Sequence, residues 1–149
     1  MLEVKNLSIS FGGLRAVSEF DMNIGKGQLY GLIGPNGAGK TTLFRLILDL
    51  LKADSGSICI GNFNVSKSEE WKNVTGAFID DSFLIDYLTP EEYFHFVGKM
   101  YGLKKDEVDE RISKFNRFMN GEVIGQKKLI RNYSAGNKQK IGIISAMLH

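Results

Sequence analysis

The fold of this chain is decided by one stretch of sequence, Gly34-Pro35-Asn36-Gly37-Ala38-Gly39-Lys40-Thr41. It has the spacing of a phosphate-binding P-loop, G-x-x-x-x-G-K-[ST], in which glycines let the backbone turn its N–H groups toward an anion. Apolar residues 29–33 before it predict a strand, and residues 43–47 after it predict a helix. This order of strand, loop and helix predicts a site for a nucleoside triphosphate.

Two side chains complete the predicted site. Lys40 would reach the β- and γ-phosphates, and the hydroxyl of Thr41 would bind Mg²⁺. A helix dipole contributes only about 0.3–1 kcal/mol, so the backbone N–H groups, the lysine and the metal must supply the rest of the affinity. The alternative is a glycine-rich turn that happens to precede a helix, and the flanking elements argue against it. The expected ligands are therefore ATP and Mg²⁺.

Composition predicts one globular domain with an ordinary core. The chain has 149 residues, of which 43% are hydrophobic and 24% charged, and its net charge is +2. Basic residues are scattered among acidic ones, so no nucleic-acid partner is expected. The single cysteine fits a reducing, intracellular setting. Because no apolar run approaches 18 residues, a membrane role would come through a partner.

The hydrophobic pattern predicts an α/β P-loop NTPase. Residues 2–33 predict three strands separated by glycine turns, and residues 57–60 and 74–79 predict two more. Thr89-Pro90-Glu91-Glu92 forms a capping box that opens a helix, a second helix follows Gly102, and a third opens at Ser134. We expect a mixed or antiparallel N-terminal β region with a partial parallel-sheet core over residues 1–85, and a helical subdomain over residues 86–149.

A second motif, Tyr133-Ser134-Ala135-Gly136-Asn137, stands roughly ninety residues after the P-loop and directly before an apolar helix. By itself it reads as an ordinary N-cap serine. Together with the P-loop, its order and spacing resemble the ATP-binding subunit of ABC transporters, in which an L-S-G-G-Q type signature precedes a helix. The resemblance covers essentially the whole chain. It implies nucleotide contacts from Phe11, Gly34, Pro35, Asn36, Gly37, Ala38, Gly39, Lys40, Thr41, Thr42, Ser134 and Gly136.

The resemblance also implies a way of working. Two such domains face each other head to tail, and each ATP lies between the P-loop of one and the signature of the other. Ser134 and the N–H of Gly136 would point at the γ-phosphate held by the opposite subunit. Phe11 would stack on adenine, although an aromatic beside a glycine turn also covers core in many strands. A membrane-spanning subunit would hold the protein at the cytoplasmic face of the membrane.

Two departures from the family bear on the site. Asp80 stands where the family has a glutamine that touches Mg²⁺, so Asp80 is a candidate metal ligand; the alternative is a solvated acidic turn with Asp81 and Ser82. The signature has Tyr133 for leucine and Ala135 for glycine, and the added methyl restricts the backbone. The family also places the membrane partner near residues 80–87. Candidate contacts there, or else ordinary core and loop anchors, are Phe83, Leu84 and Tyr87.

A third departure concerns catalysis. In the family, the helix after the signature leads to an apolar Walker B strand ending Asp-Glu and then to a switch histidine. The sequence stops at His149 before that strand, and His149 cannot replace the switch histidine, so catalytic residues stay unknown and efficient hydrolysis is not expected. An incomplete parallel sheet is expected to expose apolar positions such as Ile141, Ile144 and Leu148, and thereby to lower stability or promote self-association.

The leading hypothesis is the ATP-binding component of an ABC transporter, coupling MgATP binding and hydrolysis to membrane transport. A second is a nucleotide-binding or regulatory fragment without catalysis. A third is an ABC-type ATPase acting on nucleic acid or ribosomes, which the near-neutral charge and the lack of long insertions between Thr41 and Ser134 disfavour.

Overall fold

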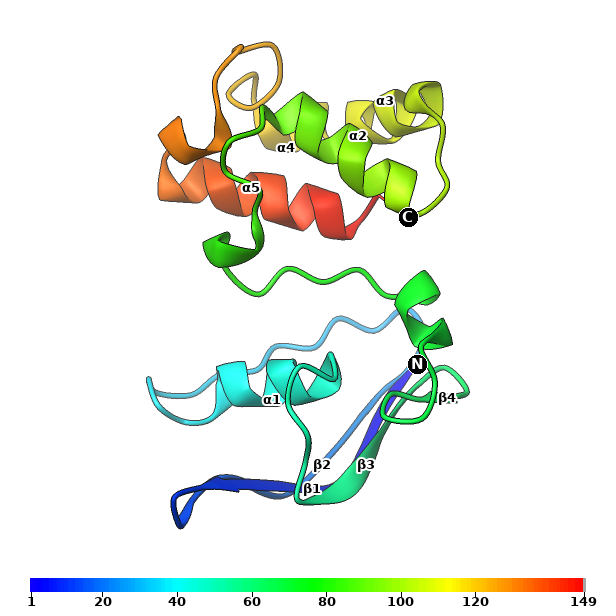
Figure 1. Ribbon diagram of the computed structural model, residues 1–149, viewed down its shortest axis with the longest axis vertical. Coiled ribbons are helices and arrows are strands. Elements are labelled where there is room, and N and C mark those ends of the chain that lie inside the picture. Colours follow the sequence, from blue (N-terminus) through cyan, green and yellow to red (C-terminus); the bar gives the residue numbers. More distant parts are fainter. Residues whose placement is uncertain (149) are drawn as a thin grey trace. The chain divides into compact units, whose positions relative to one another are not determined.

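A computed structural model describes residues 1–148, and the chain divides into two compact units, Met1–Asn73 and Val74–His149 (Figure 1). The first unit holds the P-loop, and the second holds the signature motif. His149, which is not expected to replace the switch histidine, lies outside the described residues.

The first unit is built on a four-stranded sheet in the order β2-β1-β3-β4, in which every neighbouring pair is antiparallel. Its strands are β1 (Leu2–Phe11), β2 (Leu14–Ile24), β3 (Ser55–Ile60) and β4 (Phe63–Asn64). The β1–β2 hairpin closes through Gly12 and Gly13, both with positive φ, as the sequence predicted. All four strands lie within residues 1–73, so this sheet belongs to the first unit alone.

One helix and a short 3₁₀ turn complete the core of the first unit. Helix α1 (Lys40–Ile47) and η1 (Glu70–Val74) contribute apolar side chains to a cluster with three strands of the sheet. Trp71 is buried in this cluster, and its indole N–H donates to the carbonyl of Val65 at 3.3 Å. The buried members are Val4, Leu7, Ile9, Val17, Leu43, Leu46, Ile47, Ile58, Val65 and Trp71.

Two predicted strands are wrong. Residues 28–33 form no ladder with any part of residues 1–148, and the side chains of Leu29 and Ile33 are almost fully exposed. Residues 75–79 are likewise irregular. A strand in a parallel sheet needs neighbours on its edges, and its apolar pattern alone cannot supply them. The sheet of the described chain is therefore antiparallel throughout, and the P-loop follows an irregular segment.

The second unit is helical, with a core made of side chains from most of its elements. Its elements are η2 (Asp81–Phe83), α2 (Pro90–Met100), α3 (Lys105–Ser113), α4 (Asn116–Met119), η3 (Ile130–Asn132) and α5 (Ala135–Ala146). The three helices predicted from capping and spacing are confirmed as α2, α3 and α5. The buried cluster includes Phe94, Val108, Met119, Val123, Ile130 and Ile141.

The capping box of α2 has the predicted geometry. The hydroxyl of Thr89 accepts from the N–H of Glu92 at 3.3 Å, and the carboxylate of Glu92 accepts from the N–H of Thr89 at 2.8 Å. The bond from the Thr89 N–H, and then a bond that the Thr89 hydroxyl donates to the same carboxylate at 2.9 Å, lower the pKa of Glu92. Pro90 occupies the first helical position, where its missing N–H costs nothing.

The apolar face of α5 is buried, which corrects a second expectation. Ile141, Ile144 and Leu148 are fully covered within the helical core, whereas Ile143 and Met147 on the other side are exposed. The spacing of apolar residues identified this face of α5. It could not show that α2 and α4 pack against the face, because that contact depends on the tertiary structure. Close to the middle of α5, the ring of Phe78 lies so near Gly142 that a Cβ there would overlap it.

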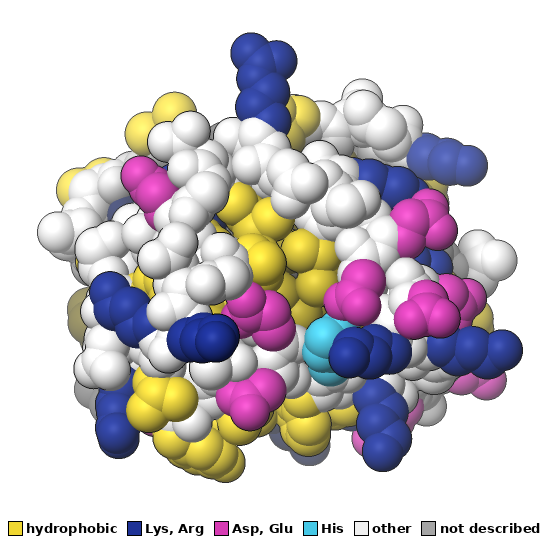
Figure 2. Space-filling model, turned by 90° about the horizontal axis from the view of Figure 1, so that it is seen from above, with side chains coloured by type: hydrophobic (Ala, Val, Ile, Leu, Met, Phe, Trp, Pro, Cys, Tyr) yellow, Lys and Arg dark blue, Asp and Glu magenta, His cyan; other side chains and the backbone are white. Residues whose placement is uncertain are grey.

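Charge on the molecular surface is mixed. Figure 2 shows one face on which basic and acidic side chains are interspersed around a group of apolar ones, without a continuous basic stripe. Among residues 1–148, none of the helices is both long and apolar enough to span a bilayer.

Candidate nucleotide-binding site

The P-loop leads into α1 through a glycine in the left-handed conformation. Gly39 is the N-cap with φ of 85°, and its carbonyl accepts from the N–H of Leu43 at 2.8 Å. A Cβ at Gly39 would overlap the carbonyl oxygen of Ala16 on β2, so this position needs glycine for both its φ and its space. Having no side chain, Gly39 leaves the first backbone N–H groups of α1 without a side-chain cap.

These N–H groups open onto a groove of about 350 Å³. Its walls come from the P-loop, the first turn of α1 and the start of β2. The lining residues are Leu14, Arg15, Ala16, Asn36, Gly37, Gly39, Lys40, Thr41 and Thr42. Phe11 ends β1 opposite Leu14, and its side chain is 49% exposed. The fold thus brings the predicted phosphate loop and the predicted adenine contact to the same end of the first unit.

The ammonium group of Lys40 lies inside the curve of the loop. Its Nζ donates to the carbonyl oxygens of Gly34 and Pro35, each at 2.7 Å. The P-loop spacing predicted a phosphate-binding role for Lys40 but not its two bonds to carbonyl oxygens, because these bonds depend on how the loop curves. A phosphate entering the groove would offer the ammonium a negatively charged acceptor in place of a neutral carbonyl, which gives a stronger bond.

The signature motif forms the start of α5, as predicted. Ser134 is the N-cap, and its hydroxyl accepts from the N–H of Asn137 at 3.3 Å. Ser134, Ala135 and Gly136 are exposed side by side, and the preceding residue, Tyr133, is buried. An exposed helix start of this kind presents its hydroxyl and N–H groups outward.

Asp80 serves as the N-cap of η2. Its carboxylate accepts from the N–H of Ser82 at 2.9 Å and also from the Ser82 hydroxyl, which is the geometry of an acidic turn. Within residues 1–148, no three His, Cys, Asp or Glu side chains lie close enough together to hold a metal ion by themselves. Of the candidate partner contacts, Phe83 and Tyr87 are exposed and Leu84 is buried.

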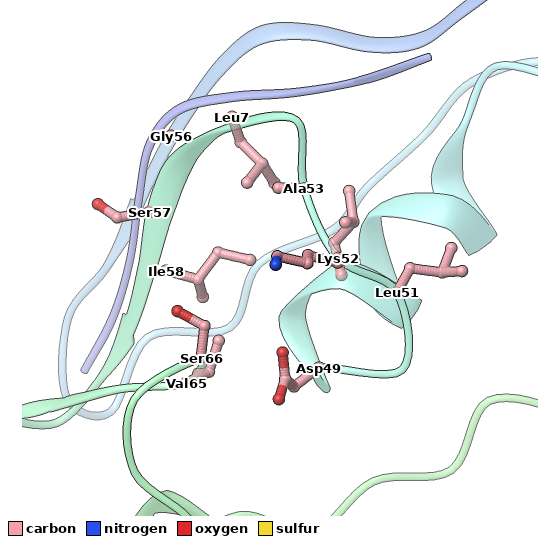
Figure 3. Close-up of a pocket in the computed structure, with 11 residues that line it drawn as sticks. Leu7, Asp49, Leu51, Lys52, Ala53, Gly56, Ser57, Ile58, Val65 and Ser66 are labelled. Carbon is pink, nitrogen blue, oxygen red and sulfur yellow. The ribbon is translucent and has the colours of Figure 1, made fainter. Parts of the chain in front are cut away.

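The first unit contains a separate cavity of about 110 Å³ near the end of α1. Figure 3 shows the side chains of Asp49 and Lys52 beside an apolar wall that includes Leu7 and Ile58. It shares no lining residue with the groove at the P-loop. The phosphate-binding geometry therefore belongs to the groove and not to this cavity.

A P-loop that opens a helix, in a chain of mixed strands and helices, defines a P-loop NTPase. The family model described as "ABC transporter" matches residues 17–149, so the chain belongs to that family.

Two curated relatives are named as ATP-binding proteins. The linearmycin resistance ATP-binding protein LnrL of Bacillus subtilis (strain 168) is 33% identical over 150 residues, which cover 100% of this chain and 48% of the relative. The bacitracin transport ATP-binding protein BcrA of Bacillus licheniformis is 33% identical over 156 residues, which cover 100% of this chain and 48% of BcrA. The chain thus spans about half the length of the curated relatives it matches.

Solved structures agree on the fold. An ATP binding subunit of an ABC transporter superimposes with a TM-score of 0.79 at 27% identity, covering 99% of this chain and 62% of that one. The ATP-binding cassette MJ0796, in a dimeric post-hydrolysis state bound to ADP and Pi, gives a TM-score of 0.80 at 22% identity, covering 99% and 69%. The predicted P-loop NTPase fold is confirmed by these neighbours.

Proposed function

We propose that this chain is part of an ATP-binding subunit of an ABC transporter, in which MgATP binding and hydrolysis are coupled to transport across a membrane. The observation that carries the proposal is the groove at the start of α1, where uncapped N–H groups, Lys40 and the start of β2 converge. Membership of the ABC transporter family supports it.

The proposed contacts follow from the lining of the groove. N–H groups of the P-loop would hold the β- and γ-phosphates, with Lys40 adding its charge and Thr41 placing a hydroxyl on Mg²⁺. Phe11 would stack on adenine at the end of the hairpin. Asp80 is the second proposed Mg²⁺ ligand, because carboxylate oxygen suits this ion; the same carboxylate caps η2.

The exposed start of α5 supports the second half of the site. Ser134 and the N–H of Gly136 would meet the nucleotide held by a second nucleotide-binding domain, so that ATP drives pairing of two domains. The dimeric MJ0796 cassette is a precedent for such pairing. A membrane-spanning partner would hold the assembly at the cytoplasmic face.

Isothermal titration calorimetry with Mg²⁺ and a non-hydrolysable ATP analogue tests the proposal. We expect wild type to bind and Lys40→Ala to bind at least about tenfold more weakly, since a charge-assisted bond to phosphate is lost. Lys52→Ala is the matched control, because it removes a lysine that lines the separate cavity and should leave the affinity unchanged. Folded wild type that gives no heat, or Lys40→Ala with wild-type affinity, would overturn the proposal.

A further inference from the structure

Tyr133 is a buried anchor placed directly before the exposed start of α5. Its side chain is 6% exposed, and its hydroxyl donates to the carbonyl of Val123 at 2.8 Å. Val123 is fully buried in the loop that follows α4, ten residues back along the chain. The ammonium of Lys128 lies 4.6 Å from the centre of the Tyr133 ring, so a second point of the same loop rests on it.

The same loop is tied to two helices at neighbouring positions. Glu122, next to Val123, pairs with Lys140 of α5 at 2.6 Å. The N–H of Gly125 donates to the carboxylate of Glu91, in the first turn of α2, at 2.6 Å. Figure 1 shows this stretch leaving α4 and returning to the start of α5. The loop is therefore fixed at its base, and Tyr133 is connected through it to α2 and α5.

We infer that Tyr133 is a positioning residue, whose hydroxyl bond to Val123 fixes the place of Ser134 and the first turn of α5. If the proposed function holds, the pairing of two nucleotide-loaded domains depends on this hydrogen bond; this consequence rests on the proposed function. Leucine, which the family signature carries in place of Tyr133, fills apolar space but has no donor. Tyr133 in place of leucine thus anchors the signature motif by a hydrogen bond as well as by apolar packing.

The hydroxyl is held as a donor under ordinary conditions. Burial, and next the negative charge of Glu91, raise the pKa of Tyr133, so the group stays protonated at neutral pH. Removing the oxygen while keeping the ring would leave the buried carbonyl of Val123 without this bond, and an unsatisfied buried acceptor is costly. The loop that carries Val123 could move so that this carbonyl finds another donor, and Ser134 would then shift as well.

The test compares Tyr133→Phe with Tyr93→Phe in the full-length gene product. Tyr93 is equally buried in the same core, beside Phe94, and no hydrogen bond of its hydroxyl is found among residues 1–148. Amide hydrogen exchange of residues 134–138 is measured first. We expect exchange to be about tenfold faster in Tyr133→Phe and unchanged in Tyr93→Phe. Equal exchange in both variants would overturn the inference.

Association driven by ATP is measured next, by sedimentation with Mg²⁺ and the non-hydrolysable analogue. Tyr133→Phe should associate several-fold more weakly while a single domain keeps its nucleotide affinity, because the P-loop is untouched. Ser134→Ala separates the two claims. If it associates as well as wild type, the proposed role of the signature fails, and the exchange measurement still decides whether Tyr133 positions Ser134.

Discussion

The two glycine-containing helix starts of this molecule are built in opposite ways. At α1, the N-cap is Gly39 in the left-handed conformation, and no side chain satisfies the first N–H groups. At α5, the N-cap is Ser134 in an extended conformation, and its hydroxyl satisfies the N–H of Asn137. The first start leaves its hydrogen-bonding capacity available to a ligand, whereas the second is stable without one.

The largest expected effect comes from adding a methyl at Gly39. Gly39→Ala must hold a left-handed φ, which costs about 1–3 kcal/mol, and its Cβ would also overlap the carbonyl of Ala16. We expect the free energy of unfolding to fall by at least about 2 kcal/mol, measured by urea denaturation. Binding of the ATP analogue should fall as well, because the loop must shift.

Gly136→Ala is the matched control at the other helix start. Nothing lies within 4 Å of a Cβ built there, and its φ is not positive. Alanine also favours helix over glycine, so the same substitution should stabilise by about 0.4–1 kcal/mol. If the two variants shift the urea midpoint in the same direction, the contrast between the two helix starts is incorrect.

Removing the serine cap should have a smaller effect. Ser134→Ala is expected to lower the free energy of unfolding by about 1 kcal/mol, because the N–H of Asn137 loses its acceptor. Ser134→Asp restores a cap and should recover this stability in the same denaturation experiment. Its carboxylate would repel phosphate, so ATP-driven association should still be lost; full association of Ser134→Asp would contradict the proposed phosphate contact.

The smallest effect concerns pH and the loop behind α5. The hydrogen bond from Lys140, and then its charge, lower the pKa of Glu122 below 4.5. Because the folded-state pKa is the lower one, the stabilisation is present above pH 4.5 and is lost as the pH falls through the folded value. The stability advantage of wild type over Glu122→Gln should therefore shrink as the pH is lowered below 4.5.

Denaturant midpoints at each pH measure this advantage. Glu69→Gln is the control, since its carboxylate is 87% exposed in an exposed pair with Lys72. An advantage over Glu122→Gln that stays constant as the pH is lowered well below 4.5 would show that the pair with Lys140 adds nothing to stability.

Local signals in the sequence predicted what depends on neighbouring residues. The capping box at Thr89, the N-cap at Ser134 and the glycine turn after Phe11 all act within a few residues, and all are present in the structure. The P-loop belongs to this group, because its spacing sets the positions of Gly39 and Lys40 directly. Family membership was also predicted correctly from these motifs.

Features that depend on distant residues were missed. Residues 29–33 have the composition of a strand, yet a strand requires a neighbour, and none is found within residues 1–148. The cover over Ile141 and Ile144 comes from other helices, so periodicity alone could not reveal it. The bond from Tyr133 to Val123 had one signal, a tyrosine where leucine is usual, but the sequence does not name its acceptor.

The contact between Phe78 and Gly142 has a mechanical consequence. The ring occupies the volume that any side chain at position 142 would need, so it rests directly on the backbone of α5. Interiors are packed too tightly to absorb an overlap, and a rotation of α5 about its axis would push against this ring. A change in the orientation of α5 would therefore require the irregular segment that carries Phe78 to move as well, and the reverse also holds.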